Sequence, residues 1–151
     1  MQIRAPISVG ELIDKITILQ IKLERLDGPG ARNVAKELAV LNQARTSAHL
    51  NEPEIAPLMI RLRAVNGELW DIEDRIRHLE ARKDFGPRFI ETARSVYRLN
   101  DSRAAIKRLI NVASDSDIIE EKSYGLNGEA LLADKNAALS GPVRLGGSLA
   151  L

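Results

Sequence analysis

The chain has 151 residues, which suits one domain, and a hydrophobic content of 44%, which is enough for a buried core. Aromatic residues make up only 3%, so aliphatic side chains must fill that core, and this favours helices packed on helices over a β-sandwich. The formal net charge of +1 provides no overall field that would attract nucleic acid or a membrane surface. The absence of cysteine excludes disulfides, thiolate metal sites and a cysteine nucleophile.

The first residues, MQIRAPISVGELIDK, lack the pattern of a secretory signal peptide. No uncharged stretch approaches the roughly 20 residues that a membrane helix needs. We therefore expect a cytoplasmic protein without a membrane span.

The first predicted helix begins at Ser8, which has capping-box spacing to Glu11. Apolar residues then follow in alternating steps of three and four, a heptad pattern that runs through Val9, Leu12, Ile16, Leu19, Leu23 and Leu26. Three further isoleucines, Ile13, Ile18 and Ile21, lie off this seam and predict that the helix packs on more than one side. Gly28 and Pro29 are expected to end it, and a second, weaker helix is expected over residues 31–50.

A third helix is predicted over residues 53–83, where the three–four rhythm is unbroken, and spans roughly 45 Å at 1.5 Å per residue. Its seam comprises Ile55, Leu58, Leu62, Val65, Leu69, Ile72, Ile76 and Leu79. Pro57 is expected to bend this helix or to move its start later. A fourth helix is predicted over residues 87–112, with Gly86 or Asp84 as its cap and a staple between Phe85 and Ile90.

The predicted fold is all-α: an antiparallel bundle of about four helices, two shorter and two long and heptad-patterned, in residues 1–124. The composition changes to Gly, Ala, Ser and Leu after residue 124, which predicts a mobile C-terminal tail over residues 125–151. A helix as long as the third extends past its shorter partners, which favours a homodimer.

Four separated blocks resemble, together and in order, a bacterial family of small uncharacterised helical proteins. The blocks are SVGELIDKITILQIKLERL, LWDIEDRIR, FIETARSVYRLNDSRAAIKRLIN and EEKSY, and the resemblance covers about residues 3–124. The family is a domain of unknown function, often associated with glycosyltransferase and surface-polysaccharide genes. The resemblance implies an all-helical fold and a polysaccharide context. It implies no activity and no catalytic residue.

Arg103 is the most unusual residue of the fourth helix, because it falls on the apolar seam. An unpaired buried guanidinium is costly, so Arg103 needs an acidic partner, a ligand anion or a route to water. The neighbouring residues that complete a candidate anion site are Arg94, Tyr97, Asn100 and Lys107. The alternative is a structural ion pair between Arg103 and acids of the third helix, for which Asp71, Glu73 and Asp74 are the candidates.

Trp70, the single tryptophan, lies beside the third seam. It is expected to stack between Arg63 and Arg77, to pack on Ile18 and Ile21, or to anchor a partner.

Asp71 and Asp74 on one helix face do not provide convergent magnesium ligands, so we predict no metal and no cofactor. Asp14 is interpreted as a member of a solvated charge pair or of an intramolecular bridge.

Two functions remain open. The first is a helical protein-interaction or scaffold module, acting on a protein partner or as a homodimer, in a surface-polysaccharide context. The second is a small helical enzyme or sensor that binds an anionic metabolite through the basic patch on the fourth helix. Whether the protein is an enzyme is left undecided, and the scarcity of aromatic residues argues against nucleic-acid binding.

Overall fold

The computed structural model describes residues 3–48, 50 and 52–122. These residues form four α-helices, α1 (Val9–Arg25), α2 (Gly28–Ser47), α3 (Glu52–Ala81) and α4 (Pro87–Ala113), and no strand. The helices have 17, 20, 30 and 27 residues, which confirms the all-α prediction with two shorter and two longer helices. The tail predicted from residue 125 onward lies outside the described residues.

α1 begins as its sequence predicts. The backbone of Ser8 is extended, and its Oγ accepts a hydrogen bond from the Glu11 amide at 3.1 Å, which satisfies one amide of the first turn. Ile13 and Ile21, off the heptad seam, are buried along with Leu12, Ile16 and Leu19 on it. α1 therefore packs on more than one side, as expected.

The boundary between α1 and α2 differs from the prediction. Gly28 does take a left-handed φ of 68°, but it opens α2 rather than closing α1, so α2 begins three residues earlier than expected. Pro29 lies at the start of α2, where its missing amide hydrogen costs nothing and its fixed φ suits a helix. The proline was interpreted as a stop, whereas it acts as a start.

α3 keeps the predicted seam. Ile55, Leu62, Leu69 and Leu79 are buried, and the other seam residues are half-buried. Pro57 lies inside the helix and does not move its start to a later residue.

At the start of α4, Gly86 is the N-cap, and Phe85 contacts Phe89 edge-to-face with ring centroids 5.3 Å apart. Phe85 thus pairs with Phe89, while Ile90 stays 53% exposed.

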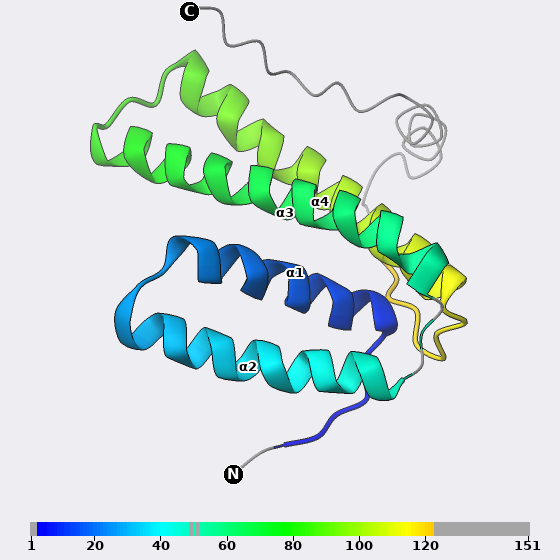
Figure 1. Cartoon of the computed structure of the whole chain (residues 1–151). Coiled ribbons are helices and arrows are strands. Elements are labelled where there is room, and N and C mark those ends of the chain that lie inside the picture. Colours follow the sequence, from blue (N-terminus) through cyan, green and yellow to red (C-terminus); the bar gives the residue numbers. More distant parts are fainter. Residues whose placement is uncertain (1–2, 49, 51, 123–151) are drawn as a thin grey trace, which may run out of the picture. The chain divides into compact units, whose positions relative to one another are not determined.

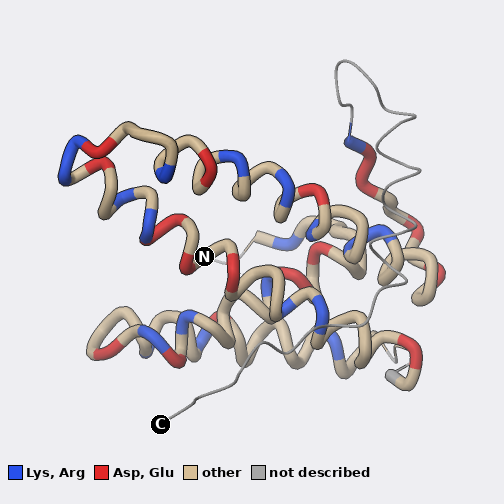
Figure 2. Tube along the Cα trace, turned by 90° about the horizontal axis from the view of Figure 1, so that it is seen from above, with Lys and Arg blue, Asp and Glu red and all other residues tan. Residues whose placement is uncertain are grey.

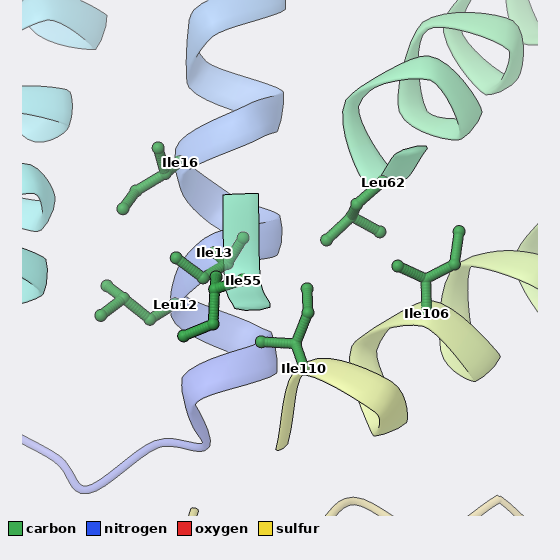
Figure 3. Packing of buried hydrophobic residues seen from close by; sticks show 7 residues of the cluster. All are labelled: Leu12, Ile13, Ile16, Ile55, Leu62, Ile106 and Ile110. Carbon is green, nitrogen blue, oxygen red and sulfur yellow. The ribbon is translucent and has the colours of Figure 1, made fainter. Parts of the chain in front are cut away.

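α1 lies at the centre of the arrangement, between α2 on one side and the α3–α4 hairpin on the other (Figure 1). It runs antiparallel to α2 and α4 and parallel to α3. The core gathers isoleucines and leucines of α1, α3 and α4, which converge in Figure 3: Leu12, Ile13, Ile16, Ile55, Leu62, Ile106 and Ile110. α2 contributes no fully buried residue, and covers this core only with half-buried side chains such as Leu38 and Leu41.

Acidic and basic residues are mixed along the helices rather than gathered on one of them (Figure 2). None of the helices in the described part of the chain combines the length and the apolarity that crossing a membrane requires.

Candidate functional site

The polar site expected around Arg103 is an ion pair between α4 and α1. Arg103 Nε donates to both carboxylate oxygens of Asp14, at 3.0 and 3.1 Å, and Nη2 donates to Oδ2. The Asp14 side chain is 1% exposed and that of Arg103 is 29% exposed. The hydrogen bonds to Asp14 hold the pKa of the Arg103 guanidinium above its ordinary value. The Nε and Nη2 donors of the Arg103 guanidinium are thus both bound to a buried carboxylate of the same chain.

The acids proposed as partners of Arg103 bind other arginines. α4 directs Arg103 toward α1, because residues 103 and 14 face each other where these two helices pack. The acids of α3 lie on its exposed side and bind arginines within reach: Asp71 binds Arg25, and Glu73 and Asp74 both bind Arg77. These are exposed pairs of small energetic value. Among the described residues, no three His, Asp or Glu side chains gather as a metal site would need.

Asn66 of α3 completes the network around Asp14. Its Nδ2 donates to Asp14 Oδ1 at 2.8 Å and to Thr17 Oγ1 at 2.9 Å, and all three residues are buried. The Thr17 hydroxyl donates in turn to the carbonyl of Asp14. The sequence analysis missed Asn66, although a signal exists: it lies four residues after Leu62 and three before Leu69, on the buried row of α3.

Lys107 forms a second polar cluster one turn further along α4. Its Nζ donates to Glu11 Oε2 on α1 and to Glu120 Oε2, the latter at 2.8 Å. Burial alone would lower the pKa of Lys107, but the hydrogen bonds to Glu11 and Glu120 outweigh it and raise the pKa. Ser8 Oγ donates to the other oxygen of Glu120 at 3.1 Å. The segment after α4 is thereby fastened to the start of α1.

Arg94 and Tyr97, two other residues of the expected anion site, lie on the exposed surface of α4. Arg94 is exposed, and Tyr97 is 55% exposed with the guanidinium of Arg98 lying 5.9 Å from its ring centroid. Asn100 Nδ2 donates to the carbonyl of Val96 in its own helix. Arg103 and Lys107 face α1, whereas Tyr97 faces solvent, so the five candidates lie on different sides of α4.

Trp70 is half-buried, and the guanidinium of Arg25 lies over it, 5.5 Å from the ring centroid. The arginines expected to stack on it bind acids instead: Arg63 binds Glu24, and Arg77 binds the acids of its own helix. A cation therefore does stack on Trp70, but it comes from the end of α1. Its role as an interface anchor stays a prediction.

An apolar groove lies beside α1, between α2 and α3. Its volume is about 640 Å³. Leu23 of α1, Leu38 of α2, and Met59 and Ile60 of α3 supply its apolar lining. The ion pair between Glu24 and Arg63 borders it.

The sequence analysis did not find this groove, because Ile60 lies opposite the heptad seam on which it concentrated. A signal was present in the sequence: Ile60 falls on the solvent side of the predicted helix with Ala56 and Ala64 one turn before and after it, and it is 71% exposed. A large apolar side chain on the solvent face of an amphipathic helix marks a candidate contact surface.

No curated protein and no solved structure was found to match the chain. A protein-family model matches residues 3–133, most of the sequence. By this match, the chain belongs to a family of unknown function, DUF6165.

Proposed function

We propose that the protein is a helical interaction module that binds a helix of a protein partner through the groove between α2 and α3. The observation that carries the proposal is the groove itself, an apolar depression of about 640 Å³ with helices on its sides. Depressions of this kind receive amphipathic helices, whose apolar residues at positions i, i+3, i+4 and i+7 fill them.

The surroundings of the groove fit this role. α2 has no fully buried residue, and its groove-lining side chain Leu38 is half-buried, so it retains surface that a partner can cover. Ile60 adds a side chain that is 71% exposed. Interfaces of this type have an apolar centre and a polar rim, and the Glu24–Arg63 pair supplies charge at the edge.

The alternative of an enzyme or sensor for an anionic metabolite has less support. An anion could take the Nε–Nη2 edge of Arg103 only by displacing Asp14, which would leave a fully buried carboxylate without its cation. Lys107 is likewise held by two carboxylates. No observation favours this reading over the interaction module.

For the biological setting, we infer surface-polysaccharide assembly in a bacterium. This setting rests only on the resemblance of four sequence blocks to a family often associated with such genes. In it, the partner would be an enzyme or scaffold of polysaccharide assembly.

The test of the interaction proposal is site-specific photo-cross-linking in the cells that make the protein. A photoreactive amino acid replaces Ile60 in one variant, and Arg75, exposed on the same helix, in a control variant. We expect a discrete protein adduct from position 60 and none from position 75. Adding Ala56→Glu, which places a charge on the groove lining at a residue outside the core cluster, should remove the adduct while leaving the circular-dichroism melt close to that of the parent. Absence of any adduct at position 60 would reject the proposal.

A further inference from the structure

The end of the α3–α4 hairpin, residues 80–90, projects past α1 and is called the hairpin end below. α1 runs parallel to α3 and stops at Arg25, which binds Asp71. α3 continues from residue 72 to Ala81, which adds roughly 15 Å at 1.5 Å per residue (Figure 1). The hairpin end is therefore a protruding part of the fold.

Two large apolar side chains are exposed at the hairpin end. Phe85 is 52% exposed, although its ring contacts Phe89, and Ile90 is 53% exposed. The Ile90 amide donates to the carbonyl of Gly86, the residue after Phe85, so the two side chains belong to neighbouring turns of the backbone. Pro87 between them is exposed as well. Large apolar side chains that are exposed together mark a contact surface.

Basic side chains accompany these apolar residues. Arg82 and Lys83 precede Phe85 in the chain, Arg88 lies between Phe85 and Ile90, and all three cations are exposed. Arginines further along both helices bind neighbouring acids. None of the three at the hairpin end pairs with an acid in the part of the chain that the structure describes. Their charge is therefore available to a ligand.

The acids of this region offset only part of that charge. Asp84 is half-buried, and its Oδ1 accepts a hydrogen bond from the Gly86 amide at 3.4 Å, so it belongs to the turn itself. Glu80, in the last turn of α3, is exposed. Glu91, just beyond the hairpin end, is bound by Arg98. Three exposed cations thus stand against one exposed acid at the hairpin end.

An anionic lipid surface suits both kinds of side chain. Lys and Arg have long apolar stems, so their charges can stay at the lipid phosphates while neighbouring apolar side chains enter the boundary of the acyl region. The attraction acts over a Debye length of about 8 Å. The cations of the hairpin end can therefore act on such a surface even though the whole chain has a formal net charge of only +1.

Other anionic partners fit the hairpin end less well. Nucleic-acid phosphates would satisfy the cations, but Ile90 has no flat ring on which a base could stack, and its exposed surface would gain nothing. Protein grooves that recognise a single element take a helix face or an extended strand, whereas the hairpin end is a turn between two helices.

We infer that the hairpin end binds the surface of an anionic lipid bilayer, with Phe85 and Ile90 inserted among the headgroups and its three cations on lipid phosphates. The inference goes beyond the interaction module, because the two surfaces are separate. Ile60, in the groove, lies roughly 30 Å along α3 from Ala81. A membrane contact at the hairpin end leaves the groove open to a protein partner.

The first test is co-sedimentation of the full chain with lipid vesicles. We expect binding to vesicles of phosphatidylglycerol and phosphatidylcholine in equal parts, and none to vesicles of phosphatidylcholine alone. Added salt should weaken the binding, because it screens the cations from the phosphates.

Charge substitutions locate the contact, and one of them should tighten it. Glu80→Lys should strengthen vesicle binding about tenfold or more, because a cation replaces an anion next to the negative surface. Its matched control is Glu54→Lys, the same change at an exposed position near the other end of α3, which should alter the affinity less than about twofold. Lys83→Glu should weaken binding about tenfold or more, and Lys36→Glu, exposed on α2, should not. A gain of affinity cannot arise from a damaged fold.

The second test concerns the apolar side chains and uses the absence of cysteine from the chain. Phe85→Cys and Lys36→Cys each carry a fluorophore whose emission shifts to the blue in apolar surroundings. We expect a blue shift at position 85 when the anionic vesicles are added, and none at position 36. Ile90→Glu should lose vesicle binding, whereas Ile60→Glu, which changes an exposed isoleucine of the groove, should keep it.

Absence of binding to the anionic vesicles would overturn the inference. Equal effects of Glu80→Lys and Glu54→Lys would also overturn it, since they would reflect overall charge rather than a contact at the hairpin end. Binding without a blue shift at position 85 would overturn the insertion. Binding of single-stranded nucleic acid that Lys83→Glu abolishes, without vesicle binding, would replace the bilayer with nucleic acid. Photo-cross-linking from position 60 tests the groove separately, so either proposal can fail alone.

Discussion

The guanidinium of Arg103 on α4 binds the buried carboxylate of Asp14 on α1, 89 positions earlier in the chain. Asn66 of α3 donates to the same carboxylate, so one side chain connects three helices. Aliphatic residues pack in several neighbouring registers with similar energy, whereas a charge of this kind is satisfied in one. Asp14 therefore determines how far α4 and α3 are shifted along α1.

Replacing Arg103 with methionine should destabilise the fold strongly. The change keeps the length of the apolar stem but leaves the Asp14 carboxylate buried with Asn66 as its side-chain donor. Breaking a buried pair from one side costs about 3–5 kcal/mol. Urea unfolding followed by circular dichroism measures the difference in unfolding free energy.

The double variant Asp14→Leu with Arg103→Met serves as the control for this loss. It removes both charges and replaces them with apolar groups of similar size, so most of the lost stability should return. If the double variant is as unstable as the sum of its single changes, the pair does not couple α1 and α4 energetically.

The sequence was sufficient for the helices and their apolar faces, because a period of three to four is a local signal. The seam of α3 is buried or half-buried along its whole length, as that period predicted. No local signal identifies the acidic partner of Arg103, because Asp14 lies 89 positions away in the chain. The position of Arg103 on its helix showed that a partner was needed, but several acids on two helices were available, and the relative placement of the helices decided in favour of Asp14 over Asp71.

The candidate site likewise combines features that the local sequence predicts with features that depend on how the helices are placed relative to one another. The position of Arg103 on the apolar seam predicted that it needed an acidic partner, a ligand anion or a route to water, and it has an acidic partner. Lys107, which was predicted to be part of an anion site, binds the carboxylates of Glu11 and Glu120. The groove could not be predicted, because it exists only where α2 and α3 stand apart on α1. Gly28 was recognised as left-handed, yet its neighbour Pro29 could serve either to end a helix or to begin one, and the local sequence did not distinguish these roles.

Gly10→Ala tests a close approach of α1 to α4. A Cβ on Gly10 would lie 2.6 Å from the carbonyl oxygen of Lys107 and 2.8 Å from Asn111 Oδ1. The Asn111 oxygen already accepts a hydrogen bond from the Gly10 amide at 2.6 Å. A backbone carbonyl cannot move aside without shifting its helix, so we expect a loss of about 1–3 kcal/mol despite the better helix propensity of alanine.

The matched change for Gly10 is Gly30→Ala in α2, where a Cβ meets nothing within 4 Å. It should leave the melting temperature unchanged or raise it slightly. Equal effects of the two substitutions in thermal unfolding would mean that α1 and α4 do not meet as closely as their geometry indicates.

Acid should release the segment after α4 from the start of α1. Burial would raise the pKa of Glu120, but hydrogen bonds with Lys107 and Ser8 outweigh it and hold the pKa below its ordinary value. A carboxyl whose folded pKa is depressed stabilises the contact above its unfolded pKa and loses that contribution as the pH falls through the folded value. The side chain is 46% exposed, so the effect should be local opening rather than global unfolding.

The amide of Val9 reports on this opening, because it donates to Ser116 Oγ in the same segment at 3.2 Å. Its hydrogen-exchange protection, corrected for the intrinsic rate at each pH, should fall on acidification. In Glu120→Gln, protection should already be low at neutral pH and should change less with acid. Full protection of Val9 in that variant would show that Glu120 does not fasten the segment.

Leu69→Asp tests the buried seam of α3 with a single charge. Leu69 is 6% exposed in the core, and an unpaired carboxylate there has no cation within the network described above. We expect loss of more than about 4 kcal/mol, enough to unfold a domain of ordinary stability. Arg75→Asp, on the exposed side of the same helix, should melt within a few degrees of the parent. Circular dichroism at 222 nm compares the two. Similar melting of both variants would place the core on a different face of α3 from the one that Ile55, Leu62 and Leu69 define.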